Sequence, residues 1–223
     1  MLVCQDLSYT YIRRPIFDKL CFKVSPTELL ILKGPNGAGK STCLNLLVGL
    51  KEIQTGSLAF TTTVGDRLDW PDYRQYLSYV GAETNGSYPK LTAMQNLMFW
   101  QRLYDGHSDK QCCLAMLERW GLGNPLVADH LSVDRFSTGM KRRLAFARLE
   151  LLAKPIWVLD EPLFGLDQNG VEQFVDTLKR HLSQKGLAIM VSHDLSPFEH
   201  LNKTIVQLDG QSEQQSLSVD TRE

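Results

Sequence analysis

The chain has 223 residues, 43% of them hydrophobic, and its 24 basic and 25 acidic residues leave a net charge of −1. This length suits one domain of ordinary size, or one domain with an inserted lobe, and the apolar content excludes wholesale disorder. The balanced charge gives no case for bulk nucleic-acid binding, so we expect no nucleic-acid partner. The apolar stretches are too short to span a bilayer, and no secretory signal is visible at the N-terminus. The five cysteines lack metal-binding spacing and are interpreted as reduced thiols.

The first half of the chain predicts strands followed by helices. Strands are expected at 2–4, 21–24 and 28–33, the last being an apolar run that ends at a glycine. A helix is predicted at 40–49, with Gly49 as its stop. Thr92 and Gln95 have the spacing of a capping box and predict a helix that continues to residue 103. Ser108 is predicted to cap a second helix that ends near Gly121. We therefore expect residues 85–135 to form an all-helical insert.

The last third of the chain alternates helices and strands. A helix is predicted from Met140 to Ala153, then a strand at 156–159, an amphipathic helix, and a strand at 187–191. Helices that alternate with buried strands predict an α/β fold with a mostly parallel core sheet. Residues 211–223 are polar and are expected to form a loose tail.

A phosphate-binding motif is the strongest local signal. Eight residues fit the pattern G-x-x-x-x-G-K-[ST] between a predicted buried strand and a predicted helix, the context that the motif requires. Its glycines let backbone N–H groups converge on phosphate oxygens, and the helix N-terminus adds partial positive charge. Lys40 is expected to reach the outer phosphates and Ser41 to ligate Mg²⁺. The predicted ATP-binding segment is Gly34, Pro35, Asn36, Gly37, Ala38, Gly39, Lys40, Ser41 and Thr42.

Two acidic residues follow the strand predicted at 156–159. Asp160 is predicted to hold Mg²⁺, directly or through water, and Glu161 to accept the proton of an attacking water. Two acids after a strand are commonly only a solvated turn. Together with the phosphate loop they become a set of groups for phosphoryl transfer, which a small-molecule kinase would also contain.

The order of motifs along the chain resembles the nucleotide-binding domain of ABC transporters. The resemblance covers nearly the whole chain and rests on the phosphate loop, the helical insert, Phe136-Ser137-Thr138-Gly139-Met140, Asp160-Glu161, Gly165-Leu166-Asp167 and His193. It implies a P-loop NTPase fold of ABC type, with an antiparallel N-terminal β portion, across residues 1–210. It also implies ATP and Mg²⁺ as cofactors, and ATP hydrolysis as the activity.

The resemblance further implies a site shared between two chains. Ser137 and Gly139 match the family's LSGGQ signature, whose helix N-terminus contacts the γ-phosphate held by the partner subunit. Phe136, Thr138 and Met140 depart from that consensus. Asp167 matches the acid of the D-loop, which crosses the dimer interface. An ordinary serine N-cap is the alternative for Ser137.

Three more site residues follow from the resemblance. Tyr11 lies where the family places an aromatic ring that stacks on adenine, with Tyr9 as a near competitor. His193 lies where the family's histidine contacts the γ-phosphate and helps to position the water. Glu83 takes the place of the family's usual glutamine, where its oxygen could meet Mg²⁺ or its water ligand.

Within the family, the chain looks most like the ATP-binding subunit of the haem exporter of cytochrome c maturation. The supporting pieces are its compact size and the segments 142–149 and 166–171. The resemblance implies integral membrane subunits as partners, a homodimer or a paired ABC subunit, and a peripheral place on the cytoplasmic face of the inner membrane. The alternatives are a drug or polysaccharide exporter subunit, an ABC-type ATPase without a membrane channel, as in iron–sulfur cluster assembly, and a non-hydrolysing regulator.

Overall fold

The computed structural model describes residues 1–62, 64–70, 72–82 and 86–209. The strands are β1 Leu2–Tyr11, β2 Arg14–Val24, β3 Leu29–Lys33, β4 Thr55–Thr61, β5 Arg67–Asp69, β6 Leu77–Val80, β7 Ile156–Asp160, β8 Leu187–Val191 and β9 Lys203–Gln207. The helices are α1 Lys40–Val48, α2 Ala93–Asp105, α3 Lys110–Arg119, α4 Thr138–Leu152 and α5 Gln168–Ser183. Short turns of 3₁₀ helix lie at Asp72–Tyr76, Val133–Arg135 and Ser196–Phe198, and a π-helical turn lies at Leu126–His130.

Two sheets carry the fold. The first has the order β2-β1-β4-β5 and its neighbours are antiparallel; the second has the order β6-β7-β8-β3-β9. In the second sheet β7, β8, β3 and β9 run parallel. Every residue of β7 and β8 is buried, which is why both read as continuous apolar runs in the sequence. The predicted α/β fold with an antiparallel N-terminal portion is therefore confirmed.

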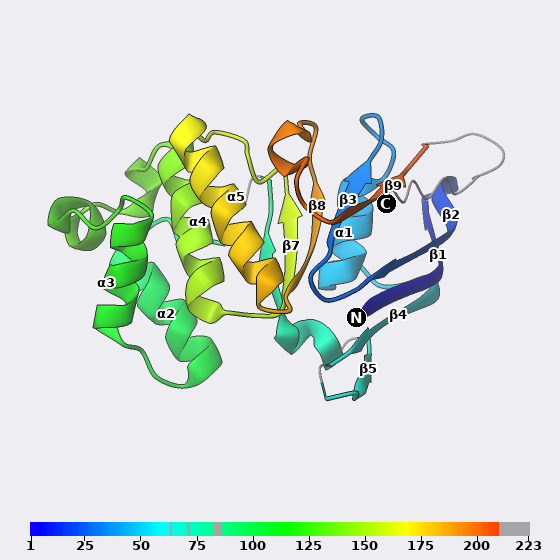
Figure 1. Cartoon of the computed structure of the whole chain (residues 1–223), viewed down its shortest axis with the longest axis horizontal. Coiled ribbons are helices and arrows are strands. Elements are labelled where there is room, and N and C mark those ends of the chain that lie inside the picture. The colour runs from blue at the N-terminus through cyan, green and yellow to red at the C-terminus, as the bar shows by residue number, and fades with distance from the viewer. Residues whose placement is uncertain (63, 71, 83–85, 210–223) are drawn as a thin grey trace. The chain divides into compact units, whose positions relative to one another are not determined.

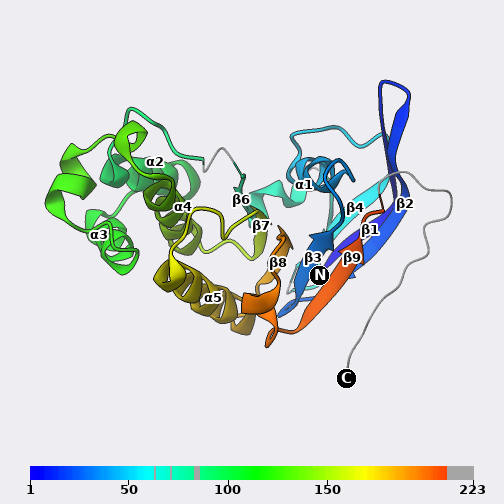
Figure 2. The ribbon, with the colours of Figure 1, turned by 90° about the horizontal axis from the view of Figure 1, so that it is seen from above.

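Among the described residues, the first of two compact units contains 1–77, 155–161 and 179–209. Its core is the parallel sheet, on which α1 lies (Figure 1). In β3, four consecutive residues are fully buried: Leu29, Leu30, Ile31 and Leu32. The loop that follows this strand is therefore anchored in the core at its first residue. Figure 2 shows the β1–β2 hairpin of the same unit as a long projecting ribbon.

The second unit contains residues 78–154 and 162–178. Helices α2, α3 and α4 pack on one another, and the rings of Trp120, Phe146 and Phe174 meet at centroid distances of 5.1 and 4.5 Å. Two buried arginines of α4 donate to backbone carbonyls, Arg142 to those of Gly81 and Ala82, and Arg148 to those of Tyr79 and Gly86. Burial lowers the pKa of Arg148 to about 10. Burying a charge is costly, and these hydrogen bonds to carbonyl oxygens offset part of that cost.

Most of the predicted element ends match the structure, with two differences. Gly49 is the left-handed C-cap of α1, and Thr92 with Gln95 forms the predicted capping box at the start of α2. The cap of α3 is Asp109 and not Ser108, because the Asp109 carboxylate accepts the N–H groups of Gln111 and Cys112. The first two strands are also far longer than predicted.

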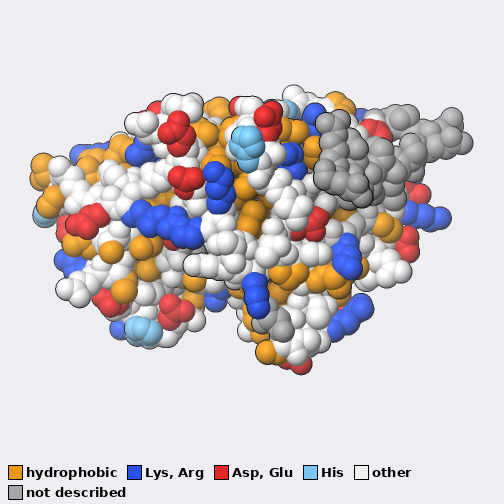
Figure 3. All heavy atoms as spheres, in the orientation of Figure 1, with side chains coloured by type: hydrophobic (Ala, Val, Ile, Leu, Met, Phe, Trp, Pro, Cys, Tyr) orange, Lys and Arg blue, Asp and Glu red, His pale blue; other side chains and the backbone are white. Residues whose placement is uncertain are grey.

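Charged groups are distributed evenly over the surface that can be followed in Figure 3, where basic and acidic side chains are interspersed. Among the described residues, no helix combines the length and the apolar character needed to cross a membrane.

Candidate nucleotide-binding site

The predicted phosphate loop connects β3 to α1 in the first unit, with glycines at the positions that need them. Gly34, Gly37 and Gly39 have φ values of 154°, 84° and 96°, where other residues are strained. A Cβ on Gly34 would collide with the carbonyl oxygen of Leu208, and one on Gly39 would collide with Ile16 Cγ2. The β1–β2 hairpin therefore packs directly on the loop, and the loop has the glycine cradle that a phosphate group requires.

The N-terminus of α1 suits an anion. Its N-cap is Gly39 in the left-handed conformation, and no side chain caps the first turn, whereas side chains cap α2, α3 and α4. Uncapped N–H groups and the helix dipole together attract phosphate. Lys40 is buried, and its ammonium donates to the carbonyls of Gly34 and Pro35 at 2.7 and 3.0 Å. An ammonium has three donors, so Lys40 is held at the loop with one donor remaining.

The two predicted acids lie at the end of β7. Asp160 is 7% exposed, and Glu161 follows in the left-handed region with φ at 47°, unusual for a residue other than glycine. The backbone N–H of Glu161 donates to the carbonyl of Val191 at 3.0 Å, and the carboxylate lies 3.3 Å from His193 Nε2. Burial, and then the neighbouring Asp160, raise the pKa of Glu161, while His193 and Lys40 oppose the rise. A raised pKa suits a proton acceptor near neutral pH.

A cavity of about 130 Å³ lies beside the phosphate loop. It is lined by Lys33, Gly34, Lys40, Ser192, His193 and Gln207. The motifs identify Gly34, Lys40 and His193, but sequence reasoning missed Lys33, Ser192 and Gln207. Lys33 and Gln207 are partners across the parallel β3–β9 pair, a register that the sequence alone does not reveal. The structure therefore brings the predicted phosphate loop and histidine together around one cavity, and adds a second lysine and an amide to its wall.

The predicted adenine platform lies on the hairpin. Tyr11 is the last residue of β1 and is 56% exposed, as a ring that receives a flat ligand should be. Tyr9, the competitor, is less exposed; its ring lies 6.5 Å from that of Phe17, centroid to centroid. Phe17 in turn would contact a Cβ on Gly39 at 3.2 Å. The Phe17 ring thus lies between the phosphate loop and the Tyr9 ring.

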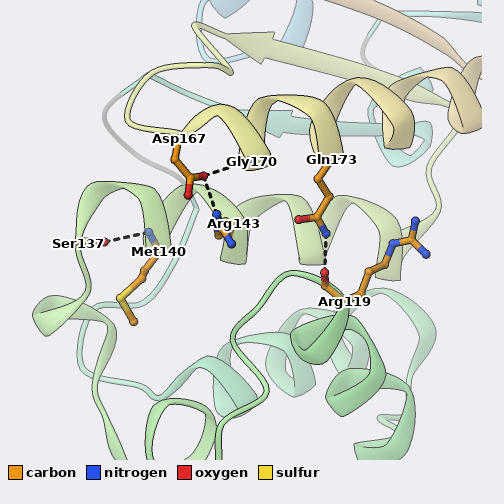
Figure 4. Close-up of polar contacts among 7 residues, drawn as sticks. All are labelled: Arg119, Ser137, Met140, Arg143, Asp167, Gly170 and Gln173. Carbon is orange, nitrogen blue, oxygen red and sulfur yellow. Dashed lines mark hydrogen bonds and ion pairs between the residues drawn. The ribbon is translucent and has the colours of Figure 1, made fainter.

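The predicted signature residues lie in the second unit (Figure 4). Ser137 is the N-cap of α4, and its hydroxyl accepts the N–H of Met140 at 3.2 Å. The ordinary capping role named as an alternative is therefore present. A capping hydroxyl still keeps its own proton as a donor, so the cap does not prevent a contact to an anion.

Asp167 lies beside the signature helix. Its carboxylate accepts from Arg143 Nη2 at 2.7 Å and from the backbone N–H of Gly170 at 2.9 Å (Figure 4). These two donors, Arg143 first, lower the pKa of Asp167. The ion pair therefore holds the predicted D-loop acid against α4 within the same unit.

The departure from consensus at Thr138 has a local explanation. A Cβ on Gly139 would lie 2.7 Å from the carbonyl oxygen of Gly165, so only glycine fits at position 139. Conversely, a Cβ on Gly165 would lie 2.7 Å from Thr138 Cγ2, so the threonine methyl takes the space that glycine at 165 leaves. The remaining candidate, Glu83, lies outside the described residues.

Comparison with known proteins places these observations in one family. Residues 17–164 match the family model described as "ABC transporter". A protein of Chelativorans sp. (strain BNC1) named "Cytochrome c biogenesis ATP-binding export protein CcmA" is 35% identical over 192 residues, or 86% of this chain and 91% of that protein. The protein of the same name from Vibrio cholerae is 33% identical over 193 residues, with the same two shares covered.

Solved structures agree with this assignment. One described as "Structure of ATP binding subunit of ABC transporter" has a TM-score of 0.80 and 27% identity, and covers 94% of this chain and 86% of its own. A second, the dimeric ATP-binding cassette MJ0796 in a post-hydrolysis state with ADP and Pi, has a TM-score of 0.78 and covers 94% of both chains. At 22% identity the second likeness shows the fold alone.

Proposed function

The chain belongs to the ABC transporter family as an ATP-binding, ATP-hydrolysing subunit, and we propose that it powers the haem exporter of cytochrome c biogenesis. The family membership supplies the activity. The observation that supports the chemistry most is the Glu161–His193 pair at 3.3 Å, which shares the first unit with the phosphate loop. The relatives named for cytochrome c biogenesis support the choice of transporter.

Each group in the first unit then has a role in hydrolysis. Backbone N–H groups of residues 36–41 bind the phosphates, and the Lys40 ammonium exchanges its two carbonyl contacts for outer phosphate oxygens. Glu161 accepts the proton of the attacking water, and His193 orients the carboxylate and contacts the γ-phosphate. Tyr11 stacks on the adenine. General-base catalysis of this kind typically accelerates a step ~10²–10⁴-fold.

The residues fit a bound Mg²⁺. Ser41 in the first turn of α1 and the buried Asp160 at the end of β7 are hard oxygen donors in the same unit. Mg²⁺ is usually held by one or two such groups together with the phosphates of the nucleotide. When bound, the ion neutralises charge that develops on the phosphate oxygens.

We further propose that each complete site uses two chains. The Ser137–Gly139 turn offers a serine hydroxyl and a helix N-terminus, which suit the γ-phosphate bound by the partner's phosphate loop. The ion pair with Arg143 keeps Asp167 beside the signature helix, and we propose that this acid also takes part in the interface. ATP then joins the two chains, and hydrolysis removes the bridging charge, so that a local phosphate contact drives a larger motion.

The membrane partners are expected on the second unit. Helix α2 exposes Phe99, Leu103 and Tyr104 by 40, 60 and 42%, and Tyr88 beside it by 43%. The rings of Tyr88 and Phe99 meet edge to face at 4.7 Å. A cluster of exposed aromatic side chains marks an interaction surface. We assign it to the integral membrane subunits, and we propose that the chain lies at the cytoplasmic face of the inner membrane.

The proposal is tested in the cells that produce this chain, with each variant in place of the wild-type protein. Glu161→Gln should leave MgATP binding intact but remove haem-loaded c-type cytochromes, while b-type cytochromes stay at normal levels. Glu172→Gln, an exposed glutamate of α5, is the matched control and should behave as the wild type. Normal c-type cytochromes with Glu161→Gln, or an equal loss of b-type cytochromes, would contradict the haem assignment. Co-purification with the subunits of a drug or polysaccharide exporter would favour that alternative.

A further inference from the structure

The segment between α1 and β4 makes an unusual set of contacts with the end of β1. Gly49 ends α1 in the left-handed conformation, and the N–H groups of Leu50 and Lys51 both donate to the carbonyl of Asn45. This C-cap fixes the direction in which the chain leaves the helix. Residues 51–54 are thereby held at the far end of the helix that begins at the phosphate loop.

Lys51 contacts both tyrosines of β1. Its ammonium lies over the Tyr9 ring at 5.3 Å from the centroid and over the Tyr11 ring at 5.5 Å. It also donates to the Tyr9 hydroxyl at 3.3 Å. Both centroid distances fall within the reach of a cation–π interaction. One charge therefore fixes the position of two rings, one of which is the proposed adenine platform.

Gln54 contacts the backbone between the same two tyrosines. Its Oε1 accepts the N–H of Thr10 at 2.7 Å, and its Nε2 donates to the carbonyl of Thr10 at 2.9 Å. Thr10 lies opposite Pro15 on the neighbouring strand, and proline has no N–H to donate. The regular pairing of β1 with β4 ends at Ser8 and Thr55. The amide of Gln54 thus bonds the backbone of β1 two residues beyond the last pair with β4.

The turn beyond Tyr11 cannot supply this order itself. Ile12 and Arg13 have φ values of 54° and 125°. Tight hairpin turns with positive φ prefer glycine, asparagine or aspartate, and a β-branched residue in that region is strained. The strained turn would leave the Tyr11 end of the hairpin free to fray if Lys51 and Gln54 did not hold it.

We propose that Lys51 and Gln54 are positioning residues that hold Tyr11 in the orientation in which it receives the adenine base. This inference rests on the proposed role of Tyr11. The ammonium covers part of the ring, and the exposed remainder is the surface against which a base stacks. The two residues therefore tune affinity for the adenine nucleotide without contacting the reacting phosphate.

The test compares binding of MgADP with binding of inorganic pyrophosphate, which lacks the base, by isothermal titration calorimetry on the full chain. Lys51→Met should weaken MgADP roughly twofold to fivefold, since the Tyr11 ring loses one cation–π contact and such a contact at an exposed site corresponds to about that factor. Pyrophosphate binding should stay unchanged, and Lys51→Arg should restore the MgADP affinity because a guanidinium also binds over aromatic rings. Gln54→Leu should weaken MgADP in the same sense.

The matched control is Lys154→Met. Lys154 lies over the Tyr104 ring at 4.7 Å in the second unit, so its removal deletes the same kind of contact away from the nucleotide.

Steady-state ATPase assays should show a raised KM with kcat within about twofold for Lys51→Met, because the lost interaction stabilises the bound substrate and the transition state equally. In a Tyr11→Leu background, Lys51→Met should have no additional effect on MgADP binding.

Two failures can be told apart. Unchanged MgADP affinity with Lys51→Met, or an equal loss of pyrophosphate affinity, would overturn the positioning role while Tyr11→Leu still weakens MgADP. Stacking of a base on an aromatic ring typically strengthens binding by a factor of roughly five or more. Unchanged MgADP affinity in Tyr11→Leu would therefore remove the platform assignment, and this inference with it.

Discussion

The packing of the β1–β2 hairpin on the phosphate loop can be measured with two glycine substitutions. Gly37 and Gly39 both have positive φ, 84° and 96°, so alanine is strained at either position. A Cβ on Gly37 meets nothing within 4 Å, whereas one on Gly39 collides with Ile16 Cγ2 and lies 3.2 Å from the Phe17 ring. Gly37→Ala is therefore the matched control that contains the backbone strain without the collision.

The two costs can be estimated separately. The left-handed conformation costs alanine ~1–2 kcal/mol, and about 0.4–1 kcal/mol is recovered because the unfolded chain loses freedom. Gly37→Ala should thus lower the free energy of unfolding by about 1 kcal/mol. Overpacking adds ~1–3 kcal/mol, so Gly39→Ala should cost about 2–4 kcal/mol. For a chain of this length each kcal/mol lowers Tm by roughly 2–4 °C.

Urea unfolding of both variants, with and without Ile16→Ala, is the assay. Ile16→Ala removes the atom that the new Cβ would strike, so it should recover most of the extra cost of Gly39→Ala and nothing for Gly37→Ala. Equal destabilisation by Gly37→Ala and Gly39→Ala would refute the claim that the hairpin rests on the loop. Gly39→Ala should also weaken MgATP binding, since relief of the collision displaces the loop.

Three further predictions concern single contacts. The pKa of Glu161 is raised, so the wild type loses stability as pH rises above the ordinary pKa of 4.5. In urea unfolding, Glu161→Gln should therefore be more stable than the wild type at pH 8 and equally stable at pH 4. An equal difference in stability at both pH values would contradict this. The Asn96 side chain is 1% exposed and forms hydrogen bonds with the backbone N–H and carbonyl of Tyr88. Asn96→Leu should therefore lower the free energy of unfolding in urea by about 2–4 kcal/mol, and a loss below about 0.5 kcal/mol would contradict this prediction. Arg143→Met removes a half-exposed ion pair, so it should change the free energy of unfolding by less than about 1 kcal/mol. Because Asp167 loses its main partner, the same variant should weaken ATP-driven association of the chains, measured by light scattering. Unchanged association would argue against the D-loop role.

The sequence predicts the chemistry of the site better than its surroundings. The phosphate loop, Asp160 and Glu161 are readable because each is a short run at a strand end, and the capping box of Thr92 and Gln95 is equally local. The predicted cap of α3, Ser108, lies one residue before the actual cap, Asp109. Serine and aspartate are both good N-caps, so the residue types alone do not determine which of the two begins the helix.

Non-local contacts could not be predicted in this way. The hairpin of β1 and β2 has Ile12 and Arg13 in its turn, which give no turn signal, so the sequence predicts an end of β1 that is too early and a start of β2 that is too late. Gln207 reaches the cavity through the parallel pairing of β9 with β3, and Gln54 reaches Thr10 across 44 residues of chain. Such contacts follow from sheet topology, which a pattern of residue types does not determine.

The shared site is the central claim, and mixing two inactive variants tests it most directly. Lys40→Ala disables the phosphate loop, and Ser137→Arg blocks the signature turn, so each homodimer alone should lack ATPase activity. A mixed dimer contains one site with both lesions and one with neither. The ATPase rate of the mixture should therefore recover to at most about half of the wild-type rate per dimer, the bound for two independent sites. A mixture that stays inactive, together with Glu161→Gln that remains monomeric at saturating ATP even with its membrane partners, would contradict the account.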